Sequence, residues 1–125
     1  MIDHVSLSVR DLGAATAFYE RLLAPLGYAK LLERATTVGF GKKYPELSLN
    51  LRSDMTTVPS NPGAHVALRA GSEDAVRAFH AAALAAGGAS DGEPGPRQAA
   101  MTTYFGAFVL DLDGNKIEAL AFPAR

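Results

Sequence analysis

The chain contains no cysteine in its 125 residues, which excludes disulfides, thiolate zinc sites and cysteine nucleophiles. It also lacks an excess of charge, with 12 Lys and Arg against 13 Asp and Glu. This balance gives no electrostatic reason to expect a nucleic acid or a membrane surface as partner. No apolar run approaches transmembrane length, and the N-terminus has no signal-peptide pattern. We therefore expect a cytoplasmic protein.

The overall composition is that of an ordinary globular protein, with 48% hydrophobic and 20% charged residues. A chain of this length fits one domain and can bury enough surface to fold without cross-links. We therefore expect residues 1–125 to form a single domain.

A strand-like segment followed by a helix-like segment occurs twice along the chain. Residues 4–9 (HVSLSV) alternate apolar and polar side chains, as a half-buried strand does, and Asp11 is a good N-cap for the helical pattern that follows. When the chain is shifted by 61 residues, His4 falls on His65, and 9 of the 25 pairs between 4–28 and 65–89 are identical. This repetition indicates an internal duplication.

Short strands follow each helical segment. They are expected at 30–34, 36–41 and 46–51 in the first half. In the second half, a loop rich in Gly and Pro (87–96) precedes strands at 101–112 and 116–122, which the Asp-Gly-Asn turn at 113–115 joins. The pattern predicts an α+β fold of two βαβββ units, unit one at 1–54 and unit two at 63–125, with a connector at 55–62.

The duplication places two histidines at the same position of two units. If the units pack about a pseudo-two-fold axis, His4 and His65 can approach one cavity from opposite walls. Glu118 lies between Ile117 and Ala119 in an apolar strand, where a carboxylate is costly unless it is paired or bound to a cation. Two neutral imidazoles and one carboxylate suit a divalent ion: Zn²⁺, Ni²⁺, Mn²⁺, Co²⁺ or Fe²⁺.

Unit one is expected to supply a fourth group from the segment 45–51. Glu46, Ser48 and Asn50 share one face of this strand. Glu46 follows a turn and Pro45, as Glu118 follows its own turn, so Glu46 is the best equivalent of Glu118. The alignment needs a gap here, and a shift by two residues would select Ser48 instead.

Three stretches, residues 2–28, 63–88 and 108–120, resemble the vicinal oxygen chelate superfamily, which includes glyoxalases, bleomycin-resistance proteins and extradiol dioxygenases. The most specific of them is LDLDGNKIEAL (110–120). The resemblance implies paired βαβββ units that form a curved mixed sheet around a metal and substrate cavity. It implies that His4, His65 and Glu118 are metal ligands. It also implies a dimer, because most relatives are dimers. At position 46 or 48 the glyoxalase type has a glutamate, whereas other members work with three protein ligands.

Other polar and aromatic residues are candidates for the substrate pocket. Arg69 shares the strand face of His65, and Tyr104 lies in the strand pair before Glu118. With Ser48 and Asn50, they complete the expected pocket. The remaining candidates are more simply explained by structure: Phe105 by core packing, Arg52 and Arg97 by surface charge, and His80 by a partly exposed helix position.

The predicted function is that of a glyoxalase-like isomerase or lyase. It would act on a small substrate with vicinal oxygens through metal-stabilised oxyanion chemistry, with Glu118 or Glu46 moving the proton. One alternative is an Fe²⁺ extradiol dioxygenase, because two histidines and a carboxylate serve both chemistries. Another is a metal-free drug-binding protein of the bleomycin-resistance type. A homodimer is expected, and the cavity could form within one chain or between two.

Overall fold

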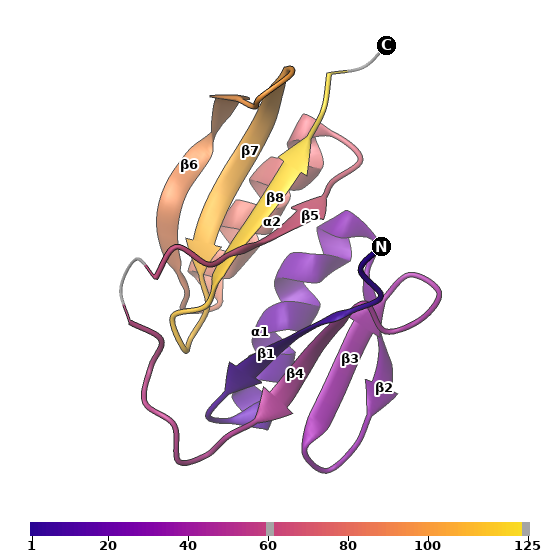
Figure 1. Ribbon diagram of the computed structural model, residues 1–125, viewed down its shortest axis with the longest axis vertical. Coiled ribbons are helices and arrows are strands. Elements are labelled where there is room, and N and C mark those ends of the chain that lie inside the picture. Colours follow the sequence, from indigo (N-terminus) through magenta and orange to yellow (C-terminus); the bar gives the residue numbers. More distant parts are fainter. Residues whose placement is uncertain (60–61, 124–125) are drawn as a thin grey trace.

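A computed structural model describes residues 1–59 and 62–123. The chain forms two units of the same architecture, each with one helix and one four-stranded sheet (Figure 1). Unit one contains β1 (Val5–Val9), α1 (Leu12–Leu23), the 3-10 helix η1 (Ala24–Leu26), β2 (Ala29–Glu33), β3 (Thr37–Gly41) and β4 (Leu47–Leu51). Unit two contains β5 (Val66–Arg69), α2 (Glu73–Ala85), β6 (Ala89–Gln98), β7 (Thr103–Leu110) and β8 (Lys116–Ala121).

The strand order is the same in both sheets: β1-β4-β3-β2 in unit one and β5-β8-β7-β6 in unit two. In each sheet the first strand pairs with the last strand in parallel, and the other neighbours are antiparallel. The expected fold class of two βαβββ units is therefore confirmed, and so is the duplication that predicted it.

Each helix starts at a side-chain cap and covers one face of its own sheet. Asp11 accepts a hydrogen bond from the Ala14 amide, and Ser72 accepts one from the Ala75 amide, which satisfies free N–H groups of the first turn. The two helices also contact each other, so their apolar faces merge into one core. None of the helices in the described part of the chain is long and apolar enough to span a membrane.

The segment expected to be a loop at 87–96 is instead a strand, β6. The prediction was wrong because Gly and Pro were taken as breakers, yet β6 is an edge strand that pairs only with β7. Proline is tolerated at such an edge, since one side of the strand needs no ladder hydrogen bonds. Register shifts between Ser90 and Gly95 absorb the irregular residues.

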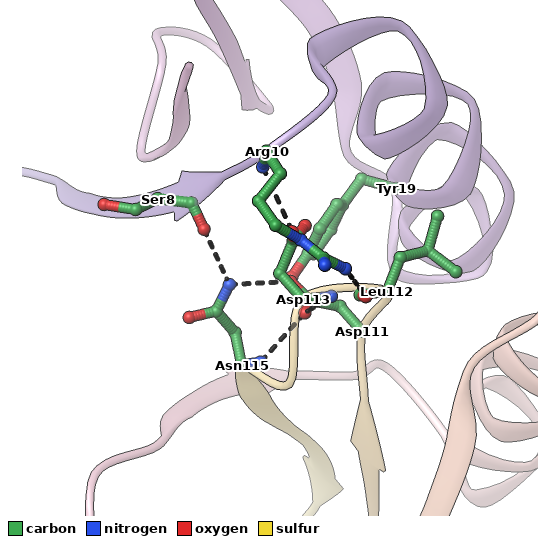
Figure 2. A network of polar contacts seen from close by, with 7 residues as sticks. All are labelled: Ser8, Arg10, Tyr19, Asp111, Leu112, Asp113 and Asn115. Carbon is green, nitrogen blue, oxygen red and sulfur yellow. Dashed lines mark hydrogen bonds and ion pairs between the residues drawn. The ribbon is translucent and has the colours of Figure 1, made fainter. Parts of the chain in front are cut away.

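A polar network joins the two units beside the turn between β7 and β8 (Figure 2). The Tyr19 hydroxyl of α1 donates to Asp111 Oδ2 at 2.5 Å, and Asp111 Oδ1 accepts the amides of Asp113 and Asn115. Arg10 Nε lies 2.7 Å from Asp113 Oδ1. Asp111 and Asp113 are both buried. The turn motif therefore holds unit one against unit two, in addition to connecting two strands.

Candidate functional site

The centre of the candidate site is a histidine and glutamate pair on unit two. His65 Nε2 lies 3.2 Å from Glu118 Oε1. His65 directly precedes β5, and Glu118 stands opposite Ala67 on the neighbouring strand β8. Both side chains lie on the face of the sheet turned away from α2, which we call the open face of unit two. The ring of His65 also meets the edge of Phe108, with centroids 5.5 Å apart.

Glu118 is buried although it lies on this open face, with 3% of the residue exposed. Its Oε2 atom is buried and has no hydrogen-bond partner among the described residues. The Tyr104 hydroxyl lies close enough to Glu118 for its pKa to be raised by this carboxylate, but it forms no hydrogen bond of standard geometry to Oε2, so the chain replaces the lost solvation of this oxygen only in part. The acceptor is therefore available to a ligand from outside the fold.

Tyr104 lies beside Glu118 over a glycine. A Cβ atom on Gly106 would stand 2.8 Å from Tyr104 Cε2 and 3.2 Å from Glu118 Oε2, so only glycine leaves room for both side chains. Burial raises the pKa of the Tyr104 hydroxyl, and the neighbouring Glu118 carboxylate raises it further, while Arg97 acts in the opposite direction. Tyr104 is therefore a protonated hydrogen-bond donor at neutral pH.

The corresponding half-site on unit one contains His4 and a serine. Ser6 pairs with Ser48 in β1 and β4, as Ala67 pairs with Glu118 in β5 and β8. Because Ser6 and Ala67 each lie two residues after the repeated histidine, Ser48 is the structural equivalent of Glu118. The register therefore corrects the expectation that Glu46 is the equivalent of Glu118. It selects Ser48, the residue given by shifting the alignment of the two units by two positions.

The other residues expected near this half-site have local partners. The His4 side chain is 54% exposed, with Nδ1 2.8 Å from Asp3 Oδ1. Asn50 accepts a hydrogen bond from Thr37 on β3. The pKa of Tyr28 is raised first by burial and then by the Glu46 carboxylate, so Glu46 lies beside Tyr28.

One chain does not bring the two half-sites together. The strand register places His65 opposite Lys116, the residue that follows Asn115. The side chain of Asn115 donates a hydrogen bond to the carbonyl of Ser8, near the C-terminal end of β1. His4 is four residues before Ser8, a distance of roughly 13 Å along an extended strand. The arrows of β1 and β5 accordingly point in opposite directions (Figure 1). Within residues 1–59 and 62–123, no three His, Asp or Glu side chains are grouped as ion ligands.

Two further expectations about single residues can be compared with the structure. His80 was expected to be partly exposed, but only 4% of it is, and its Nε2 lies 2.8 Å from Ser90 Oγ, a partner supplied by the unexpected strand β6. Phe105 packs against the core, as expected. Sequence reasoning missed Phe108 and Phe122 on the open face. The alternation of β7 and β8 around Gly106 and Glu118 could have identified both.

Comparison with known proteins is consistent with this geometry. The sequence model of the Glyoxalase/Bleomycin resistance protein/Dioxygenase superfamily matches residues 1–119. The chain belongs to this superfamily. A glyoxalase/bleomycin resistance protein of known structure from Albidiferax ferrireducens T118 is 30% identical, with a TM-score of 0.84 over 95% of this chain and 97% of that chain. No curated protein sequence matches the chain.

Two more distant solved structures are similar to this chain in fold alone. A glyoxalase/dioxygenase from Nostoc punctiforme is 20% identical, with a TM-score of 0.73 and coverage of 99% of this chain and 92% of that chain. A genomically encoded fosfomycin resistance protein from Listeria monocytogenes is 18% identical, with a TM-score of 0.68 and coverage of 98% and 93%.

The superfamily is often metal-dependent, and the donors of unit two fit an ion of that kind. An imidazole nitrogen and a carboxylate converge there, and the unpartnered Oε2 of Glu118 is an anionic acceptor that a cation would satisfy. Ser48 supplies no carboxylate on the unit-one side. In this chain, His65 and Glu118 are thus the two expected ligands that lie together.

Proposed function

We propose that this protein is a metal-dependent enzyme acting on a small substrate with two adjacent oxygen atoms. The supporting observation is the pair of His65 and Glu118, in which a buried carboxylate oxygen has no partner from the chain. The ligands are His4 from one copy of the chain and His65 and Glu118 from a second copy. This assignment is supported by the contact of Asn115 with Ser8 and by the opposite directions of β1 and β5, which place His4 toward the end of β1 that lies away from His65.

A divalent ion held by these ligands would supply Lewis-acid polarisation of the substrate oxygens. The chain's own residues then bind and move protons around it. Glu118 would balance positive charge, and its oxygen that does not hold the ion could take a proton from the substrate carbon and return it to the neighbouring carbon or oxygen of the product. Tyr104 stays protonated at neutral pH and can donate a hydrogen bond to a developing oxyanion. The assignment gives an isomerase or lyase reaction of the glyoxalase kind.

A second candidate is an Fe²⁺-dependent dioxygenase that cleaves a vicinal diol. This candidate is favoured by the position of Ser48, which is the structural equivalent of Glu118 in unit one. A serine stands there in place of the second carboxylate that the glyoxalase-type ligand set would use. Two histidines and one carboxylate form the ligand set typical of non-haem iron oxygenases. The identity of the bound metal and a requirement for O₂ distinguish the two reactions.

Metal content tests the proposal directly. Tag-free protein is reloaded separately with Zn²⁺, Ni²⁺, Mn²⁺, Co²⁺ and Fe²⁺, and the bound metal is measured by inductively coupled plasma mass spectrometry. We expect about one ion per chain in the wild type and a loss of most of it in His65→Ala and Glu118→Gln. Glu46→Gln is the matched variant, since it makes the same chemical change at a residue outside the three-ligand set, and it should retain the ion.

Failure of every metal to bind the wild type would refute the proposal and favour a metal-free binding protein. If Glu46→Gln also loses the ion, the result would support the four-ligand set that the sequence predicted, with Glu46 as the fourth ligand.

A further inference from the structure

A stacked arginine lies on the open face of unit two, beyond the histidine and glutamate pair. The Cζ atom of Arg69 on β5 is 4.7 Å from the ring centroid of Phe122, and the Phe122 ring is 6.2 Å from the ring of Tyr104. Both Arg69 and Phe122 are exposed. Stacking on an aromatic face restricts a guanidinium without using its hydrogen-bond donors. Arg69 therefore presents a fixed cation beside the site.

The register fixes where the backbone of Arg69 lies relative to Glu118. Ala67 pairs with Glu118, and Arg69 pairs with Leu120. Arg69 is therefore one same-face step, roughly 7 Å, beyond the row that contains Glu118. Because the Arg69 guanidinium is stacked on Phe122, two residues beyond Leu120, a substrate whose adjacent oxygens lie at Glu118 would reach it across the Tyr104 and Phe122 rings.

The surface between these two points suits a flat, apolar body. Leu120 of β8 pairs with Gly106 of β7, which pairs with Gly95 of β6. Gly106 and Gly95 contribute no side chain to this row, and the space above Gly106 holds the Tyr104 ring beside the Glu118 carboxylate, while the Arg97 guanidinium lies near Gly95. Leu120, Tyr104 and Phe122 therefore make the surface between Glu118 and Arg69 apolar and largely aromatic.

Arg77 on α2 is also stacked on an aromatic ring, but its charge is paired within the protein. Its Cζ is also 4.7 Å from a ring centroid, that of Phe105, but the guanidinium contacts Glu73 at 3.5 Å and Asp74 at 3.0 Å. Among the residues that the structure describes, Arg69 forms no such ion pair. The cation of Arg77 is neutralised within its own helix, whereas that of Arg69 is available to a ligand.

We propose that Arg69 is a specificity-determining residue that binds a carboxylate of the substrate, so that the substrate is a small organic acid with an apolar or aromatic body between its vicinal oxygens and that carboxylate. The proposal rests on the function proposed above for the placement of the vicinal oxygens. Its anion-binding part depends only on Arg69 and the surface around it.

The test compares two probes that differ in charge, 3,4-dihydroxybenzoate and its neutral methyl ester. Dissociation constants are measured by isothermal titration calorimetry on the Zn²⁺-loaded wild type, on Arg69→Gln and on the matched Arg77→Gln. We expect the wild type to bind the acid about tenfold more tightly than the ester, as a charge-assisted contact would give. Arg69→Gln should lose this preference with unchanged ester affinity, and Arg77→Gln should keep it.

An equal affinity of the wild type for both probes, or a preference that survives in Arg69→Gln, would overturn the proposal. The titrations are repeated on metal-free protein to separate this result from the metal hypothesis. Absence of metal binding with an Arg69-dependent preference for the acid refutes only the proposed function. Metal binding without that preference refutes only the assignment of Arg69.

Discussion

Gly106 is the residue on which the shape of the site depends most. Its missing side chain allows the Tyr104 ring and the Glu118 carboxylate to occupy adjacent space above β7. Tyr104 can contact the same substrate as Glu118 only because of this approach. A methyl group added at position 106 would therefore displace two candidate site side chains, those of Tyr104 and Glu118.

Gly106→Ala is expected to lower the free energy of unfolding by about 1–3 kcal/mol, because the new methyl group must displace Tyr104 or Glu118. It should also weaken metal binding, since Glu118 is the proposed carboxylate ligand. Urea unfolding and metal titration measure the two effects. Gly71→Ala is the matched control, because nothing lies within 4 Å of its added Cβ. An unchanged stability and metal affinity in Gly106→Ala would contradict the packing described.

The residues of the site were predictable from the sequence to different degrees. The repeat selects His4 and His65 as candidates, the isolated charge in an apolar strand selects Glu118, and the structure places His65 and Glu118 together. The choice between Glu46 and Ser48 does not follow, because the alignment of the two units needs a gap there. The pairing of β1 with β4 decides it, because it sets Ser6 opposite Ser48.

At the scale of elements, the connection between β7 and β8 has two tasks. It reverses the chain, with Gly114 at a φ of 90°, and it provides the carboxylates that receive Tyr19 and Arg10 from unit one. The sequence motif identified the turn correctly. The contact with α1 was not predictable, because it depends on how two separate units pack.

The buried Tyr19 hydroxyl predicts a pH dependence of stability. Burial raises its pKa well above the ordinary value of 10.0, and the Asp111 carboxylate raises it further. The folded state therefore keeps this proton at a pH where the unfolded state loses it. Its contribution to stability is complete below about pH 10 and decreases as the pH rises toward the folded-state pKa, by up to about 1.4 kcal/mol per pH unit.

Tyr19→Phe should be less stable than the wild type at pH 8 by about 1–3 kcal/mol, since Asp111 loses a buried donor. The difference between the two proteins should shrink between about pH 10 and 11. Urea unfolding at several pH values measures it. Tyr44→Phe, at a tyrosine that is 50% exposed, should follow the wild type throughout. A constant difference between Tyr19→Phe and the wild type would contradict the assignment.

The edge strand β6 could not be predicted from its local sequence. Its composition favours turns, and its extended form is imposed by pairing with β7. The helices, by contrast, carry their caps and apolar faces in their own sequence. Elements with a local signal were therefore predictable, and an element defined by its neighbour was not.

At the scale of the whole molecule, the two units present their half-sites at separate places. The polar network around Asp111 and Asp113 fixes this arrangement within the chain. In the proposed function, a complete ligand set would therefore form where the unit-one half-site of one copy meets the unit-two half-site of another. Two such sites would form in a symmetric dimer.

Mixing two inactive variants tests this shared site. His4→Ala and His65→Ala each remove one ligand from every site of their own dimer. After co-refolding, a mixed dimer contains one site with both histidines and one with neither, so the sample should regain about a quarter of an ion per chain. Metal analysis of the mixture, beside each variant refolded alone, provides the measurement. No recovery in a mixture shown to contain mixed dimers would favour a site within one chain.

The serine at position 48 also sets the charge of such a cavity. Two neutral imidazoles and a single carboxylate leave one net positive charge on a divalent ion, where a second carboxylate would have cancelled it. With Arg69 nearby, the cavity would have a positive electrostatic potential despite the almost neutral chain. A negatively charged molecule would then be drawn inward before it makes any contact, and added salt would slow its entry.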